Sequence, residues 1–193
     1  MATVVIDPGH GGSAKEGGSS PNNATGPTGL KEKTVTLDIA KRVEPLLEAD
    51  GIATRLTRTD DSNLGLAERA GVAKAAGADA FVSIHFNGFD GATQGTETWT
   101  HSDGSSDSKA LAAAVQKKLV AATGLKDRKV QSKVLGCLKA ALHAPKTAAC
   151  LVEISFMDVP AEEARLKTDA YKDKVARAIA DGIRDWLKAD GRI

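Results

Sequence analysis

Short apolar runs alternate with helical patterns along almost the whole chain. Apolar runs predict strands over Thr3–Ile6, Ile52–Arg58, Ala80–His85, Thr96–Thr100 and Cys150–Ile154. Apolar spacings of three and four residues predict helices over Lys33–Asp50, Leu66–Ala76 and Ser108–Ala122, with two more after Pro160. This alternation predicts an α/β fold, a single domain with a central, twisted, mostly parallel (mixed) sheet and helices on both faces.

Two segments fit neither pattern. Ser13–Gly29 is rich in Gly, Ser, Asn and Pro and predicts a long loop, which in a compact domain is often functional. Val134–Leu142 is ambiguous, and we interpret it as a strand or a hairpin. No repeat or internal linker interrupts the pattern, so we expect residues 1–193 to form one domain.

Composition excludes some partners. The 26 basic and 25 acidic residues give a formal net charge of +1, which provides no strong field for nucleic acid or an anionic membrane. The longest apolar runs, such as Ala148–Ile154, are too short to span a bilayer. The first strand starts at Thr3 with no signal-peptide pattern before it, so we expect either a trimmed domain or a chain that is not exported by the usual route.

The two cysteines and two of the four histidines are expected to be structural. Cys137 and Cys150 are not in a CxxC pair, so we expect two buried thiols, with a disulfide as the alternative. His101 and His143 are interpreted as surface residues, with the edge of the groove as the alternative for His143.

Polar residues interrupt apolar strands at three places. His10 follows the first strand, His85 ends another, and Glu153 lies inside a third. Two histidines and a carboxylate with one open position make a hydrolytic zinc site, and a second carboxylate is then needed as a base. Glu32 at the start of the first helix completes the set. Glu32 as ligand and Glu153 as base is a consistent allocation, which spacing alone does not fix.

Taken singly, these residues have ordinary explanations. A histidine after a strand is more often a turn residue or a satisfied core residue than a ligand. An isolated glutamate at a helix start is usually a favourable partner of the helix dipole. A glutamate inside an apolar strand is rarer, because its charge is costly there without a partner.

Seven segments, in order along the chain, resemble the zinc-dependent N-acetylmuramoyl-L-alanine amidases of the amidase 3 type. The segments are Val5–Gly12, Gly29–Lys33, Thr57–Asp60, Leu66–Arg69, Ala78–Asn87, Gly95–Thr98 and Leu151–Phe156. The resemblance implies a zinc ion (Zn²⁺) held by His10, Glu32 and His85, with Glu153 as the catalytic base.

The resemblance also implies a role near the metal for Glu97. Asp7 and Asn87 flank the ligands, and we expect them to orient the imidazoles. The alternative for both is turn chemistry, since Asp-Pro-Gly and Asn-Gly form turns. Phe86, Gly88 and Asp158 depart from the family pattern and are expected to lie on the groove rim.

The function implied is hydrolysis of the amide between the muramic acid lactyl group and L-alanine of peptidoglycan. The expected partner is peptidoglycan, both glycan strand and stem peptide, with no nucleic acid and no membrane insertion. We expect a monomeric catalytic domain without a separate wall-binding domain. It would act in the periplasm or cell wall, and it could be made in the cytoplasm and released on lysis. A lysin and a host remodelling enzyme remain alternatives.

Three other functions are weighed against this one. A zinc peptidase or deacetylase would use the same residues on another amide. A wall-binding module would keep the fold without catalysis, but all four key residues are present. A small-molecule α/β enzyme would need a phosphate-cradling loop, and Gly9–Gly12 is not GxGxxG.

Overall fold

The computed structural model describes all 193 residues, and its strands and helices follow one another almost without interruption. The strands are β1 (Thr3–Pro8), β2 (Ala53–Leu56), β3 (Ala80–Asn87), β4 (Thr96–His101), β5 (Asp127–Lys133) and β6 (Ala148–Phe156). The helices are α1 (Glu32–Glu48), α2 (Leu66–Ala75), α3 (Ser106–Thr123), α4 (Pro160–Leu166) and α5 (Asp169–Ala189). Two short 3₁₀ turns, Gly136–Leu138 and Ala140–Leu142, precede β6.

The six strands form one mixed sheet in the order β2-β1-β3-β6-β4-β5. Strands β2, β1, β3 and β6 run parallel to one another. Strand β4 is antiparallel to β6, and β5 runs parallel to β4. The predicted fold class, one α/β domain with a mostly parallel mixed sheet, is therefore confirmed.

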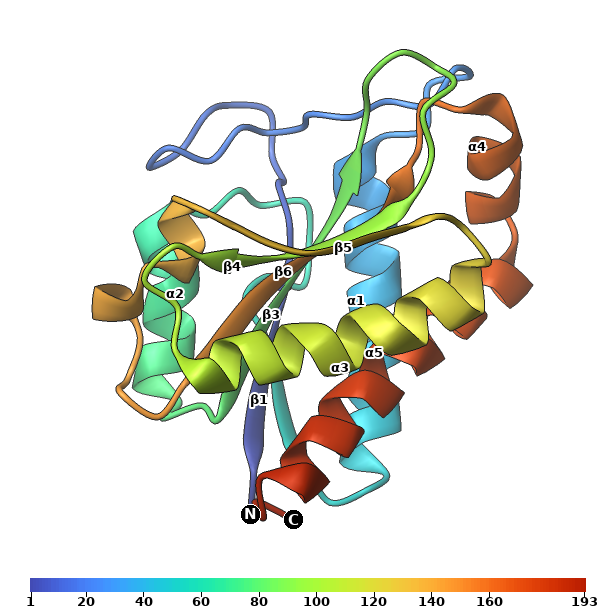
Figure 1. Ribbon diagram of the computed structural model, residues 1–193. Coiled ribbons are helices and arrows are strands. Elements are labelled where there is room, and N and C mark those ends of the chain that lie inside the picture. Colours follow the sequence, from blue (N-terminus) through green and yellow to red (C-terminus); the bar gives the residue numbers. More distant parts are fainter.

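Helices cover both faces of the sheet, as predicted (Figure 1). Alternate residues of each strand point to opposite faces. Val4 and Ile6 of β1 join the larger core under α1, α3 and α5, whereas Val5 between them joins a smaller core under α2. No helix is long and apolar enough to cross a membrane.

Two local predictions differ from the structure. Asp127–Lys133 forms the edge strand β5, which the apolar pattern did not indicate, because most of its side chains are polar and partly exposed. The predicted strand or hairpin at Val134–Leu142 is wrong, since this segment makes two 3₁₀ turns. The expectation of two buried, unpaired thiols at Cys137 and Cys150 is confirmed.

The long connections gather at one edge of the sheet, opposite the two chain termini (Figure 1). The predicted loop Ser13–Gly29 leads from β1 to α1. The β3–β4 connection and the segment after β6 reach the same edge (Figure 1). Parallel strands β1 and β3 end here, where ligands bind in open α/β sheets.

Candidate metal centre and active-site cleft

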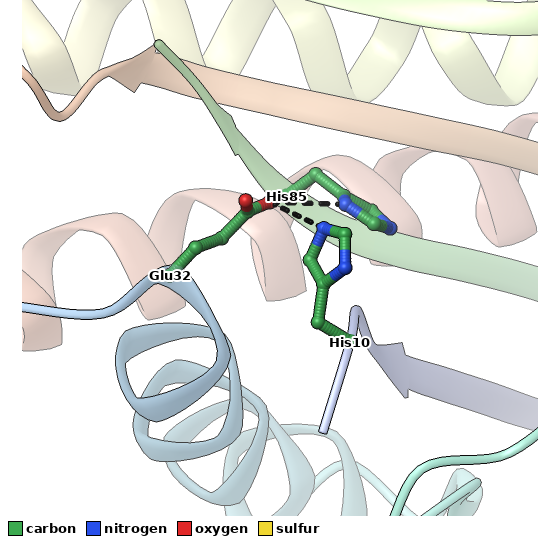
Figure 2. Close-up of side chains that lie close together, drawn as sticks. All are labelled: His10, Glu32 and His85. Atoms are coloured by element: carbon green, nitrogen blue, oxygen red, sulfur yellow. Dashed lines mark hydrogen bonds and ion pairs between the residues drawn. The ribbon is translucent and has the colours of Figure 1, made fainter. Parts of the chain in front are cut away.

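Three side chains from distant segments converge at this edge. His10 lies just after β1, Glu32 is the first residue of α1, and His85 lies near the end of β3. One nitrogen or oxygen atom from each lies within 4.8 Å of the other two, and the three side chains point toward a common centre (Figure 2). Two imidazoles and a carboxylate are a donor set that suits zinc.

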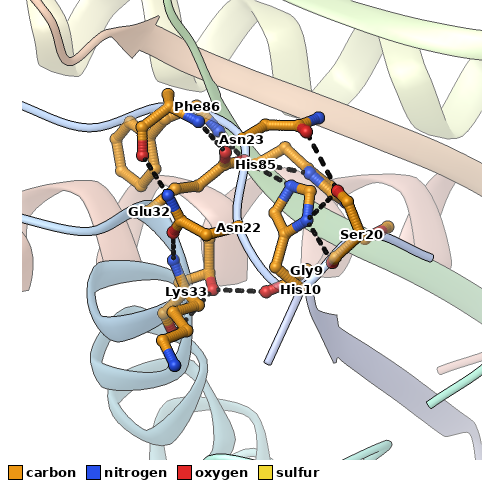
Figure 3. Close-up of polar contacts among 12 residues, drawn as sticks. Gly9, His10, Ser20, Asn22, Asn23, Glu32, Lys33, His85 and Phe86 are labelled. Carbon is orange, nitrogen blue, oxygen red and sulfur yellow. Dashed lines mark hydrogen bonds and ion pairs between the residues drawn. The ribbon is translucent and has the colours of Figure 1, made fainter. Parts of the chain in front are cut away.

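The contacts of His10 select which of its nitrogens faces the cluster. Its Nδ1 lies 2.9 Å from the carbonyl oxygen of Ser20 (Figure 3). A carbonyl only accepts, so Nδ1 carries the hydrogen and donates it. Nε2 then faces Glu32 Oε1 at 3.1 Å, and it is buried without a well-formed hydrogen bond. A metal ligand of this kind commonly has its other nitrogen fixed by a carbonyl.

Glu32 is almost completely buried, with 1% of its surface exposed. Oε1 accepts a hydrogen bond from the backbone N–H of Phe86, and Oε2 accepts one from that of Ala24 (Figure 3). Burial alone would raise the pKa of Glu32, but the contacts with His10 and His85 hold it well below its ordinary range. Burial likewise opposes a charge on His10, yet Glu32 raises the pKa of that imidazole. The carboxylate is therefore ionised and fixed by two backbone donors.

The ring of His85 packs against the backbone of Gly9. Its Nδ1 lies 3.1 Å from Glu32 Oε1. A Cβ atom on residue 9 would lie 2.4 Å from both Cε1 and Nε2 of this ring. Only glycine leaves the imidazole room at this place.

Two buried arginines hold the turn that carries His10. His10 has a left-handed backbone conformation, with φ of 61°, which residues other than glycine seldom adopt. Arg69 donates to the carbonyl oxygens of Pro8 and His10, and Arg58 donates to those of Pro8 and Gly9. The guanidinium groups thus fix three successive carbonyls of the turn.

Asp7 supports this turn without touching an imidazole. Its carboxylate accepts hydrogen bonds from Thr57, Arg69 and Ser83. Burial alone would raise its pKa, but the charge of Arg69 and these hydrogen bonds lower it. The structure therefore differs from the expectation that Asp7 orients an imidazole, because the carbonyl of Ser20 makes that contact.

Glu153 lies beside the cluster in the middle of a row of polar residues. In the strand register it pairs with His85 of β3 on one side and Glu97 of β4 on the other. Its Oε2 is buried and has no hydrogen-bond partner. Burial raises the pKa of Glu153 well above its ordinary value, the charges of Glu32 and Glu97 add to this, and Lys133 opposes it. A carboxyl with a raised pKa holds a proton more readily than an ordinary glutamate does.

Both carboxylate oxygens of the neighbouring Glu97 have partners. Oε1 accepts from Asn87 Nδ2 at 3.0 Å and from Trp99 Nε1 at 3.2 Å. Oε2 pairs with Arg128 Nε at 2.6 Å. Asn87 therefore holds Glu97 and touches neither imidazole, which differs from its expected role.

A cleft passes along this row in two lobes that share Asn23, His85 and Glu153. The first lobe measures about 590 Å³, and we name it the Phe89 lobe. It is also lined by Ala24, Thr25, Glu32, Phe86, Asn87, Gly88, Phe89 and Asp158.

The second lobe measures about 270 Å³, and we name it the Lys133 lobe. It is also lined by Asp7, His10, Gly18, Ser19, Ser20, Leu66, Arg69, Lys133, Leu135, Gly136, Cys137 and Leu151. A substrate can therefore extend to both sides of Glu153.

The other two histidines are buried, so their assignment to the surface is wrong. The His101 Nδ1 pairs with Asp103 in the turn after β4. His143 Nε2 contacts the carbonyl oxygen of Cys137 at 2.8 Å. Neither belongs to the metal cluster.

Sequence reasoning missed the supporting contacts. Ser20, Arg58, Arg69 and Arg128 act through hydrogen bonds to residues far away in the sequence. The one available signal was Arg69, a charged residue on the helix face that also carries Ala73 into the core.

Comparisons with known proteins agree with this architecture. Residues 4–185 match the Amidase_3 family, described as N-acetylmuramoyl-L-alanine amidase. The N-acetylmuramoyl-L-alanine amidase LytC of Bacillus subtilis is 40% identical over 188 residues, which cover 96% of this chain and 36% of LytC. The chain thus spans about a third of that relative.

Two solved structures have the same fold. The catalytic domain of the amidase CwlV from Bacillus (Paenibacillus) polymyxa var. colistinus superposes with a TM-score of 0.85 at 35% identity. That match covers 97% of this chain and 99% of the CwlV domain. An N-acetylmuramoyl-L-alanine amidase from Clostridium difficile 630 gives 0.88 at 31% identity, covering 98% of each chain. The chain therefore belongs to the Amidase_3 family of N-acetylmuramoyl-L-alanine amidases.

Proposed function

We propose that this chain is a zinc-dependent N-acetylmuramoyl-L-alanine amidase, in which His10, Glu32 and His85 hold the metal and Glu153 is the base. The observation that carries the proposal is the convergence of these three donors beside the unpartnered carboxyl of Glu153. The donor set fits zinc, since the buried His10 Nε2 lacks a well-formed hydrogen bond and Nδ1 is already fixed.

The chain's own residues account for the movement of the proton. Zinc, when bound, supplies Lewis acidity that polarises the amide carbonyl and acidifies water. Glu153 accepts the proton of the attacking water and delivers it to the nitrogen of the departing amine. Its raised pKa suits both steps, because a shuttle must accept and release at similar pH. Arg58 and Arg69 keep the His10 turn rigid during the reaction.

The two lobes support a substrate that continues on both sides of the scissile bond. The amide between the lactyl group of muramic acid and L-alanine is such a bond, with glycan on one side and peptide on the other. We propose that the chain works as a single catalytic domain and monomer on peptidoglycan of the cell wall. A lysin and a host remodelling enzyme share this chemistry.

Replacement of Glu153 by Gln tests the assignment of the base. We expect kcat on purified peptidoglycan to fall about 10²-fold or more, because proton transfer is lost. Zinc content, measured by plasma mass spectrometry, should stay at one ion per chain. Glu48→Gln on the exposed end of α1 is the matched control and should keep full activity. Full activity of Glu153→Gln would refute the assignment.

Product analysis separates the amidase from a zinc peptidase or deacetylase. An amidase releases a lactyl carboxylate and a new amino terminus on L-alanine. Mass spectrometry of digested peptidoglycan should find these two ends. A new amino terminus at any other stem residue, or release of acetate, would favour the alternatives.

A further inference from the structure

We propose that the two lobes bind opposite ends of the substrate, with the stem peptide in the Lys133 lobe and the glycan in the Phe89 lobe. In this arrangement the Lys133 ammonium pairs with a carboxylate on the stem residue that follows L-alanine. The inference rests on the proposed function, and it adds the direction of binding and a residue that selects the peptide.

Lys133 is an exposed cation at the edge of the cleft, and no carboxylate forms an ion pair with it, although its charge acts on the buried Glu153. Its Nζ lies 5.1 Å from the ring centroid of Trp99, and it makes no ion pair or side-chain hydrogen bond. A cation over an indole face is held in place while its N–H donors stay free. Trp99 is itself fixed by its hydrogen bond to Glu97. Lys133 is therefore positioned to receive an anion.

Arg69 is the one other lysine or arginine that lines this lobe, and its donors are already used. Arg69 is 1% exposed, and its donors bond to Asp7, Asn63 and the carbonyls of Pro8, His10 and Leu64. A substrate carboxylate that enters the lobe therefore meets Lys133.

The walls of the Lys133 lobe suit a short peptide. Leu66, Leu135 and Leu151 provide apolar surface for a small side chain such as the methyl group of alanine. The Ser20 carbonyl and the hydroxyls of Ser19 and Ser20 already bond to His10, Asn63 and Asn23, so this lobe contacts a peptide through its apolar wall and Lys133.

The Phe89 lobe has the opposite chemistry. It is lined by Asp158 and by no lysine or arginine, so a peptide carboxylate finds no such partner there. Thr25 and Asn87 line this lobe alone, and the Thr25 hydroxyl and the Asn87 amide oxygen are uncharged polar groups that suit sugar hydroxyls and acetamides.

Phe89 adds an exposed ring to this lobe. It is 78% exposed, and its loop is held because Asp158 Oδ2 accepts from the N–H groups of Phe89 and Gly91. An aromatic ring fixed on the rim of a polar cleft suits the apolar face of a sugar. The Lys133 lobe therefore suits a charged peptide, and the Phe89 lobe suits an uncharged glycan.

The test uses two muramoyl tetrapeptides that differ only at the second stem residue. One carries a free α-carboxylate there, and the other carries an α-carboxamide. Wild-type enzyme should cleave the carboxylate form with about five-fold higher kcat/KM, the effect of one partly exposed ion pair. In Lys133→Gln this ratio should fall to about one, chiefly through KM.

Lys126→Gln is the matched control, because Lys126 is an exposed lysine directly before β5 and lines neither lobe. It removes the same charge and should keep the five-fold ratio. Equal ratios in wild type and Lys133→Gln would overturn the inference while leaving the amidase activity standing. Failure of wild type to cut either substrate at the lactyl amide would instead refute the proposed function.

A binding measurement tests the direction without catalysis. In zinc-loaded protein followed by NMR, the L-alanyl-γ-D-glutamate dipeptide should shift the amide signals of Lys133–Gly136. An N-acetylglucosaminyl-muramic acid disaccharide should shift those of Phe89 and Gly91. The reverse pattern would overturn the proposal.

Discussion

At the scale of single residues, the surroundings of two glutamates shift their pKa values in opposite directions. Both are glutamates of this site: Glu32 belongs to the cluster, and Glu153 lies beside it. Glu32 touches two imidazoles and two backbone N–H groups, which favour its charged form. Glu153 has a buried oxygen without a partner and two acidic neighbours, which favour its neutral form. Opposite shifts of this kind fit one ligand and one proton shuttle.

The raised pKa of Glu153 predicts how stability depends on pH in metal-free protein. The folded chain holds this proton to higher pH than the unfolded chain, whose pKa is near the ordinary 4.5. The stabilising effect of the neutral carboxyl is complete below that value. It is lost as pH rises toward and through the folded pKa.

Glu153→Gln keeps a neutral group at every pH and so avoids this loss. Urea unfolding of both proteins after removal of metal with a chelator measures the difference. The free energy of unfolding of Glu153→Gln, relative to wild type, should increase as pH rises from 4.5 to 8. A difference that stays constant over this range would contradict the raised pKa.

At the scale of elements, the sheet register builds the row of polar residues along the cleft. Adjacent strands β3, β6 and β4 bring His85, Glu153 and Glu97 side by side on one face. The turn after β1 and the first residue of α1 then bring His10 and Glu32 next to His85 (Figure 2). Close approach of the β1 turn to β3 is what brings the two imidazoles together, and it requires glycine at position 9.

Gly9→Ala tests this close approach. The new methyl group would overlap the His85 ring at 2.4 Å, so the ring must move away from Glu32. We expect zinc affinity, measured by competition with a fluorescent chelator, to fall about 10- to 100-fold, as when a support of a metal ligand is lost.

Gly71→Ala in α2 is the control for this substitution. A Cβ atom there meets nothing within 4 Å, so zinc affinity should not change. Helix propensity should make this variant more stable by about 0.5–1 kcal/mol. Unaltered zinc affinity in Gly9→Ala would show that the turn does not position His85.

The apolar pattern predicted the central strands because Val4–Ile6 and Phe81–Ile84 are buried on both faces. It missed β5, since Asp127–Lys133 is a polar edge strand whose pairing with β4 depends on tertiary structure. The residues of the metal cluster were predicted from motif resemblance. Their supports were not, because they are contacts with the main chain: the Ser20 carbonyl accepts from His10 Nδ1, and Arg58 and Arg69 donate to carbonyl oxygens of the His10 turn.

At the scale of the whole molecule, the apolar cores and the cleft lie in different parts of the fold. The larger core under α1, α3 and α5 and the smaller core under α2 hold the sheet from both faces. Loops at one edge line much of the cleft. The chain termini lie at the other end of the sheet (Figure 1). Rigid strands thus position the reacting groups, and the loops determine what binds around them.

Anomalous diffraction at the zinc absorption edge, from crystals of the zinc-loaded protein, tests the metal centre most directly. We predict one peak per chain, at about 2.0–2.2 Å from a nitrogen of His10, a nitrogen of His85 and an oxygen of Glu32. A zinc peak bound elsewhere, or no peak between these three side chains, would contradict the account.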